Sequence, residues 1–118
     1  MADQSLIDAL RARDTAALTG LLTADAVFHS PVQSYEGRDL ALRVLSASAQ
    51  VIDDIRVVSE FESGDEKVTF FAGTVRGSKL EGVVRELRVP EGIREVTLMV
   101  RPLGALQVAM ERMRQLLA

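Results

Sequence analysis

Residues 27–31 read Val27-Phe28-His29-Ser30-Pro31, and this short run decides how the rest of the chain is interpreted. The run is too short and too rich in β-branched and aromatic side chains for a helix. It predicts a strand that Pro31 ends or holds at a sheet edge. It also contains His29, the only histidine in the chain. Because neighbouring strand residues point to opposite faces, Phe28 and Ser30 share one face and His29 takes the other.

Apolar residues recur at helical spacing on both sides of this run. A first helix is predicted to begin near Asp3 or Ser5, and a second at Asp14, whose carboxylate can cap it. After the run, Gly37 breaks the chain and Asp39 is placed to cap a third helix.

Beyond residue 53 the apolar period changes to two, which predicts four strands separated by turns. Tight turns make neighbouring strands antiparallel. The strands are expected at Ile55–Ser63, Lys67–Arg76, Lys79–Val89 and Ile93–Arg101. A final helix is predicted from about Leu103, with an inward apolar stripe formed by Leu106, Met110, Met113 and Leu117.

Helices followed by a four-strand meander are typical of an α+β fold. We therefore expect one domain over residues 1–118, with a cone-shaped, curved antiparallel sheet around the N-terminal helices and a C-terminal helix. Such a shape readily forms a pocket. Neither face of the last strand is clearly polar, so a helix or a second subunit should cover its outer face. Two-fold dimers are the commonest oligomers, and we expect a homodimer through the outer sheet face.

The amino-acid composition excludes several classes of binding partner. The 118 residues carry a net charge of −3 and no cluster of basic residues, so nucleic-acid binding is not expected. With no cysteine and one histidine, we expect neither a metal site nor a cofactor. The N-terminus lacks a signal-peptide pattern, and no apolar stretch approaches the ~20 residues that span a membrane. A cytoplasmic location without a membrane partner is the expectation.

Three segments resemble the nuclear transport factor 2-like superfamily and, within it, the SnoaL-like proteins. They are residues 21–31, residues 35–38 and the closing segment 93–103, which resembles a bacterial subgroup of small uncharacterised members. The resemblance covers nearly the whole chain and implies the cone-shaped fold. It implies no single activity, because the fold hosts isomerases, cyclases, epoxide hydrolases, binding domains and transport adaptors.

Ketosteroid isomerase is the relative whose chemistry can be compared residue by residue. By the resemblance, its base, an aspartate before a proline, corresponds to Ser30, and its oxyanion-hole tyrosine corresponds to Leu6. Its protonated oxyanion-hole aspartate corresponds to Arg85 or Glu86. Serine is a poor proton acceptor and leucine donates no hydrogen bond. The resemblance therefore does not carry that isomerase mechanism to this chain.

Two residues are candidates for catalysis. His29 is a candidate because histidine as a residue type suits proton transfer at physiological pH, although a histidine packed beside the sheet is the alternative. A Ser30–His29 nucleophile pair is not expected, because adjacent strand residues do not easily meet. Alternation predicts that Arg85 faces the core, where its charge needs a partner. It would anchor a ligand carboxylate or polarised carbonyl, or else form an internal ion pair.

The predicted function is binding of a small apolar or weakly acidic organic ligand in a mostly apolar pocket. An enzyme version would be a cofactor-independent isomerase, cyclase or hydrolase using Arg85 and His29. The alternative is a non-catalytic dimerisation or protein-interaction module. For several of the pocket residues ordinary core packing is the competing interpretation. The predicted pocket residues are Phe28, Ser30, Tyr35, Phe70, Arg85, Met99 and Arg101.

Overall fold

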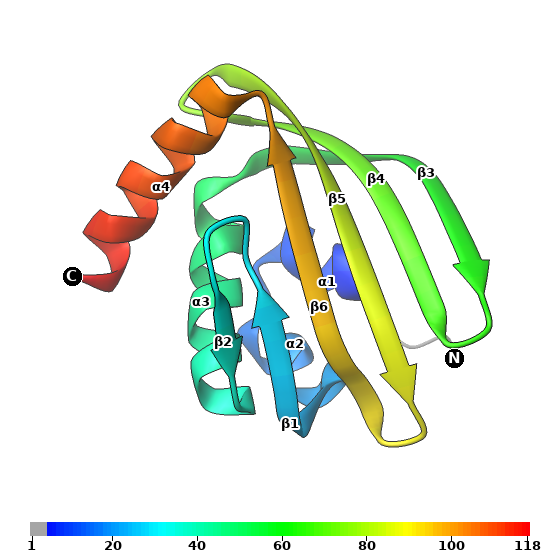
Figure 1. Ribbon diagram of the computed structural model, residues 1–118. Coiled ribbons are helices and arrows are strands. Elements are labelled where there is room, and N and C mark those ends of the chain that lie inside the picture. Colours follow the sequence, from blue (N-terminus) through cyan, green and yellow to red (C-terminus); the bar gives the residue numbers. More distant parts are fainter. Residues whose placement is uncertain (1–4) are drawn as a thin grey trace.

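The computed structural model describes residues 5–118, and within them the chain forms four helices and six strands (Figure 1). In chain order the elements are α1 (Leu6–Ala12), α2 (Thr15–Leu21), β1 (Leu22–His29), β2 (Ser34–Glu36), α3 (Arg38–Val51), β3 (Asp53–Ser63), β4 (Glu66–Val75), β5 (Ser78–Val89), β6 (Gly92–Arg101) and α4 (Leu103–Leu117).

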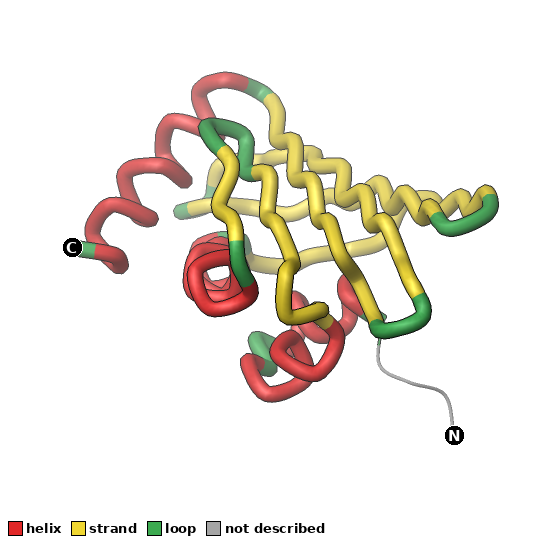
Figure 2. The backbone as a smooth tube through the Cα atoms, turned by 60° about the horizontal axis from the view of Figure 1, so that its bottom comes forward, coloured by secondary structure: helices red, strands yellow, loops and turns green. Residues whose placement is uncertain are grey.

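The six strands form one curved, open sheet in the order β2-β1-β6-β5-β4-β3. Helices α1, α2 and α3 lie against its concave side, and α4 extends from the end of β6 toward α3 (Figure 2). This arrangement confirms the predicted α+β cone. One part of the prediction is wrong, because β1 runs parallel to β6 and the sheet is therefore mixed. The short strand β2, antiparallel to β1, was not predicted.

The helix starts follow local side-chain chemistry in two of three predicted cases. The Ser5 hydroxyl accepts a hydrogen bond from the Asp8 N–H, and the Asp14 carboxylate accepts one from the Ala17 N–H. Asp3, the alternative start, lies outside the described residues. The third prediction is wrong, because α3 begins after Gly37, whose positive φ of 91° suits a residue without a Cβ. Asp39 lies in the first turn of α3 instead.

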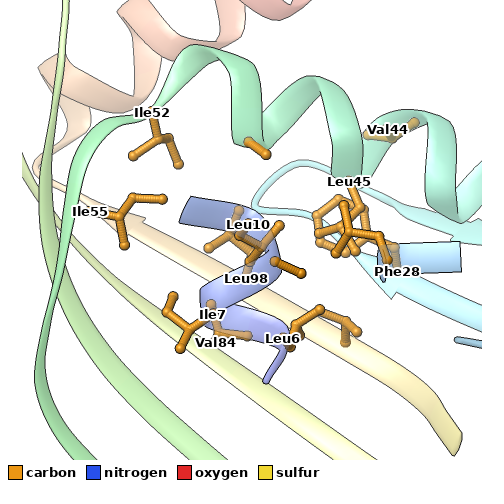
Figure 3. Packing of buried hydrophobic residues seen from close by; sticks show 14 of the residues in the cluster. Leu6, Ile7, Leu10, Phe28, Val44, Leu45, Ile52, Ile55, Val84 and Leu98 are labelled. Atoms are coloured by element: carbon orange, nitrogen blue, oxygen red, sulfur yellow. The ribbon is translucent and has the colours of Figure 1, made fainter. Parts of the chain in front are cut away.

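The core fills the space between the helices and the concave face of the sheet. Ile7 and Leu10 of α1, Leu45 of α3 and the sheet residue Leu98 surround one small internal space, and all four side chains are buried (Figure 3). Removing such aliphatic side chains from water contributes about 1.5–3 kcal/mol each. Figure 3 also labels Leu6, Phe28, Val44, Ile52, Ile55 and Val84 in this cluster.

In strand β5 the side chains alternate as predicted, but the two faces are the reverse of those expected. Val84 and Glu86 are buried on the concave face, whereas Arg85 points to the outer, convex face. The apolar neighbours Val83 and Leu87 suggested the opposite, because the outer face of this strand is itself largely apolar. The prediction that Arg85 faces the core is therefore wrong.

Candidate functional site

An apolar cavity, called the main cavity below, lies between α3, α4 and the concave face of β6 and has a volume of about 240 Å³, although other hollows of the surface are larger. It exists because α4 packs incompletely. Only Ala105 and Ala109 of that helix are fully buried, so its larger apolar side chains border open space instead of filling it. The lining residues are Ser30, Pro31, Val32, Tyr35, Val44, Ser48, Val51, Ile52, Leu98, Val100, Leu106, Ala109, Met110, Met113, Arg114 and Leu117.

Two arginines hold the C-terminal half of α4 in place beside this cavity. The Arg43 guanidinium of α3 donates to the Leu117 carbonyl at 3.3 Å. The Arg76 guanidinium, from the turn after β4, donates to the Gln115 side-chain oxygen at 3.2 Å. The wall formed by α4 is thus attached by polar contacts at the surface and leaves the interior side apolar.

The uncharged polar groups of the lining all form hydrogen bonds within the protein, although the Tyr35 hydroxyl does so only as an acceptor. The Ser48 hydroxyl donates to the Val44 carbonyl at 3.0 Å. The Tyr35 hydroxyl accepts from the Gln33 amide at 3.0 Å. The Ser30 hydroxyl donates to the Gln33 carbonyl and accepts main-chain N–H groups of the same turn. A ligand in this cavity therefore meets mainly hydrocarbon and thioether surface.

Arg114 is the charged residue of the lining and lies at the edge of the cavity. Its side chain is 73% exposed and contacts the Glu111 carboxylate at 2.8 Å. An exposed i,i+3 ion pair of this kind contributes little to stability, so the guanidinium can exchange its partner at small cost. Among the described residues that line the cavity, Arg114 is the only group suited to bind an anion.

Chemically, this cavity is suited to binding. Its lining contains no histidine, lysine, cysteine or carboxylate among residues 5–118. These are the usual general bases, and a general base must lie within hydrogen-bond reach of the proton that it removes. Residues 5–118 also contain no cluster of three metal-ligating side chains and no helix long and apolar enough to cross a membrane.

The structure divides the predicted pocket residues between the two faces of the sheet. Ser30 and Tyr35 line the main cavity, and Phe28 is buried behind them, with its ring stacked on that of Tyr35 at a centroid distance of 6.4 Å. Phe70, Met99 and Arg101 instead line an open groove of about 380 Å³ on the convex face. The seven predicted residues therefore do not form one pocket.

The two candidate catalytic residues also lie on the convex face. His29 on β1 is beside Thr97 on β6, and Thr97 is beside Arg85 on β5. Arg85 is ion-paired with Glu66 of β4. Both residues are thus separated from the main cavity by the sheet itself.

His29 has two polar partners that sequence reasoning missed. Its Nδ1 atom is 2.6 Å from the Ser34 hydroxyl, and its Nε2 atom is 2.9 Å from the Glu95 carboxylate. Strand alternation places Glu95 on the same face as Thr97, and this could have indicated from the sequence that Glu95 lies on the outer face. The pairing of β1 with β6 that brings Glu95 to His29 was not visible in the sequence.

The convex face carries large apolar side chains around the groove, which we call the outer patch. It comprises the exposed residues Val58, Phe61, Phe70 and Met99 and the half-buried Val83. Phe70, Val83 and Met99 are direct neighbours on β4, β5 and β6. Phe61 meets Phe70 edge to face at a centroid distance of 6.2 Å.

Comparison with known proteins agrees with the family resemblance of the sequence. The family model described as SnoaL-like domain matches residues 4–112, which is most of the chain. The chain belongs to the SnoaL-like domain family. No functionally curated protein matches it significantly.

Solved structures similar to this SnoaL-like domain share its architecture. A steroid delta-isomerase from Pseudomonas aeruginosa superimposes with a TM-score of 0.86 at 29% identity, covering 92% of this chain and 83% of that one. An uncharacterised protein with a cystatin-like fold from Silicibacter pomeroyi gives 0.85 at 22% identity, covering 90% and 77%. A putative polyketide cyclase from Sinorhizobium meliloti gives 0.70 at 20% identity, covering 79% and 88%. The two less identical proteins show the fold alone.

This SnoaL-like domain places the residues that correspond to ketosteroid isomerase chemistry in structural roles. Leu6 is fully buried in the core, and the Ser30 hydroxyl is engaged in its own turn. Of the two alternatives for the third position, Glu86 is the residue on the concave face. Its carboxylate is bound by Arg88 at 2.7 Å and is only 1% exposed.

Proposed function

We propose that this SnoaL-like domain binds a small, mostly apolar organic molecule in the cavity between α3, α4 and β6. The observation that carries the proposal is the aliphatic and methionine lining around about 240 Å³ of space. A cavity of roughly 150 Å³ holds benzene, so this one has room for a ligand of about ten non-hydrogen atoms. The resemblance to a steroid delta-isomerase supports an apolar class of ligand.

Arg114 favours a ligand with a weakly acidic end. Its guanidinium is at the edge of the lining and is held only by the exposed Glu111 carboxylate. A ligand carboxylate can take that place through two parallel hydrogen bonds while its apolar part enters the cavity. In this proposal Arg114 performs the anchoring role that sequence reasoning gave to Arg85.

The cavity supports binding more than it supports an isomerase, cyclase or hydrolase reaction. The reason is that the described lining contains no histidine, lysine, cysteine or carboxylate, so an apolar ligand would meet no side chain suited to accept a proton at neutral pH. His29 and Arg85 lie on the opposite face of the sheet and would not reach a ligand held beside α4.

Filling the cavity tests this function. Octanoic acid and 1-octanol are suitable probes, and their binding is measured by calorimetry and by thermal stabilisation of the folded protein. Leu106→Trp places an indole inside the cavity and should abolish binding of both probes. Leu103→Trp changes the same helix at an exposed position outside the lining and should leave binding intact. Unchanged binding by the folded Leu106→Trp variant would contradict the proposal.

The outer patch supports a second role, homodimerisation through the convex sheet face. Met99, near the C-terminal end of β6, is 61% exposed, and Val83 of β5 lies between it and the exposed Phe70 of β4. The ion pairs Arg85–Glu66 and Arg101–Glu81 lie beside this apolar surface on the same face. Both signs of charge therefore border the patch, which allows it to pair with a second copy of itself across a two-fold axis.

A further inference from the structure

Ser34, His29 and Glu95 form a continuous chain of hydrogen-bonding side chains on the convex face of the sheet. They come from three adjacent strands, β2, β1 and β6. The Ser34 hydroxyl is 2.6 Å from His29 Nδ1, and His29 Nε2 is 2.9 Å from the Glu95 carboxylate. This is the order of contacts, hydroxyl to imidazole to carboxylate, that activates a serine nucleophile.

Strand register explains why these side chains meet. The Ser30 N–H donates to the Gln33 carbonyl and the Gly37 N–H donates to the Ala26 carbonyl, each at 2.9 Å. Hydrogen-bonded pairs alternate in an antiparallel ladder, so His29 and Ser34 form a non-hydrogen-bonded pair, in which side chains approach more closely.

Glu95 reaches His29 from the other neighbouring strand. The parallel pairing of β1 with β6 places Glu95 beside Val27, two residues before His29 and on the same face. Its carboxylate therefore lies diagonally across from the imidazole. The arrangement depends on both ladders of β1, one antiparallel and one parallel.

For the neutral imidazole of His29, donor and acceptor chemistry fixes the tautomer. An ionised carboxylate only accepts hydrogen bonds, so the nitrogen that faces Glu95 must carry the hydrogen. Nδ1 then has a free lone pair, and the Ser34 hydroxyl must donate to it. The imidazole is thus oriented as a base toward Ser34, with Glu95 as the positioning residue behind it.

We propose that Ser34 is a nucleophile activated by His29 and Glu95, and that this outer site transfers acyl groups from small, accessible esters. Ser34 is exposed, and the side chains of His29 and Glu95 are 35% and 31% exposed. The site lies on the same convex face as the outer patch but shares no residue with it, and its three side chains are accessible. Access favours a short acyl group on a good leaving alcohol.

The reaction balances with the residues present and water. Ser34 Oγ forms a bond to the acyl carbon as its proton passes to His29 Nδ1. The bond to the leaving oxygen then breaks, and that oxygen takes the proton from His29. A water molecule, deprotonated by His29, next attacks the acyl-serine, releases the carboxylic acid and restores the Ser34 hydroxyl. By the alternation described above, the Ser34 N–H points away from β1, where it can stabilise the negative charge on the acyl oxygen.

The outer site is separate from the proposed ligand cavity, which lies on the concave side. Loss of one function therefore does not imply loss of the other. Because His29 is the only histidine in the chain, no other serine can have an imidazole base within the same protomer.

Acylation by p-nitrophenyl acetate tests the proposal on the whole chain. We expect release of p-nitrophenolate and an acetyl group on Ser34, located by mass spectrometry of peptides. Ser34→Ala should remove this label, and His29→Gln should slow labelling about 10²-fold, the typical effect of losing a general base. The control Ser63→Ala, at an exposed serine in β3, should react as the parent protein does.

Acetylation found only on Lys67, Lys79 or Ser63, or unchanged labelling kinetics in folded His29→Gln, would overturn the proposal. Circular dichroism confirms that each variant is folded. Nitrogen-15 NMR of the single imidazole provides a second measurement that does not need a substrate. We expect the neutral ring to carry its hydrogen on Nε2 and Glu95→Gln to weaken this preference. A hydrogen on Nδ1 in the parent protein would overturn the proposal as well.

Discussion

The phenyl ring of Phe71 on β4 lies directly over Gly82 on β5, where a Cβ atom would come within 2.2 Å of the ring's Cζ. The two residues are cross-strand neighbours on the concave face. Glycine is required here for space, and its absent side chain allows the ring to lie flat against the sheet. Phe71 is consequently buried as part of the core.

Gly82→Ala should destabilise the protein by about 1–3 kcal/mol, because the added methyl group forces the ring of Phe71 out of its position. Chemical denaturation measures the change in the free energy of unfolding. Gly20→Ala is the control, because nothing lies within 4 Å of its Cβ position in helix α2. It should be neutral or stabilising by up to about 1 kcal/mol. Equal effects of the two substitutions would contradict the steric explanation.

Arg114→Gln should weaken octanoate binding about fivefold and leave 1-octanol binding unchanged. The reason is that an exposed charge pair contributes up to about 1 kcal/mol, which corresponds to that factor. Calorimetric titration with both probes gives the comparison. Arg112→Gln, on the same helix but outside the cavity lining, should alter neither affinity. If Arg114→Gln weakens both probes equally, the guanidinium does not bind the carboxylate, although the cavity still binds apolar ligands.

Met99→Glu should convert the proposed homodimer into a monomer, because it places a charge within the outer patch. Sedimentation equilibrium of both proteins gives their masses. Leu103→Glu, an equally exposed apolar position outside the patch, should remain dimeric. A parent protein that is monomeric at micromolar concentration, or a Met99→Glu variant that remains dimeric, would contradict this interface.

Arg88→Met should lower the free energy of unfolding by about 1–3 kcal/mol, because it leaves the buried Glu86 carboxylate without its guanidinium partner. Adding Glu86→Gln should recover much of this loss, since a neutral amide costs less to bury. Arg101→Met breaks the exposed pair with Glu81 and should cost no more than about 1 kcal/mol. Thermal and chemical denaturation provide the values. A similar cost for the two arginine substitutions would show that burial of Glu86 does not matter.

The order of elements was readable from the sequence because it depends on short-range chemistry. Asp14 caps α2 through a residue three positions away, and turns of a few residues fix the antiparallel strands of the meander. The boundaries of these strands agree with the prediction to within two residues. The resemblance to SnoaL-like proteins then gave the curvature of the sheet and the position of the helices.

The functional surfaces depended on contacts between distant segments. The sequence predicted the alternation in β5 but assigned Arg85 to the wrong face. The reason is that the convex face carries an apolar patch that resembles a core face. No local signal indicated that β1 runs beside β6, since no turn joins them. That pairing alone brings Glu95 to His29.

By itself, the sequence determined an α+β cone, the places where α1, α2 and most of the strands begin, and the alternate facing of Phe28 and His29. These features follow from periodicity, caps and turns, which act within a few residues. Only the tertiary structure decided that α4 leaves a cavity against α3, that Arg114 lies at its edge, and that Ser34 and Glu95 flank His29. Those relations arise from packing and strand register between segments far apart in the chain, which local patterns do not specify.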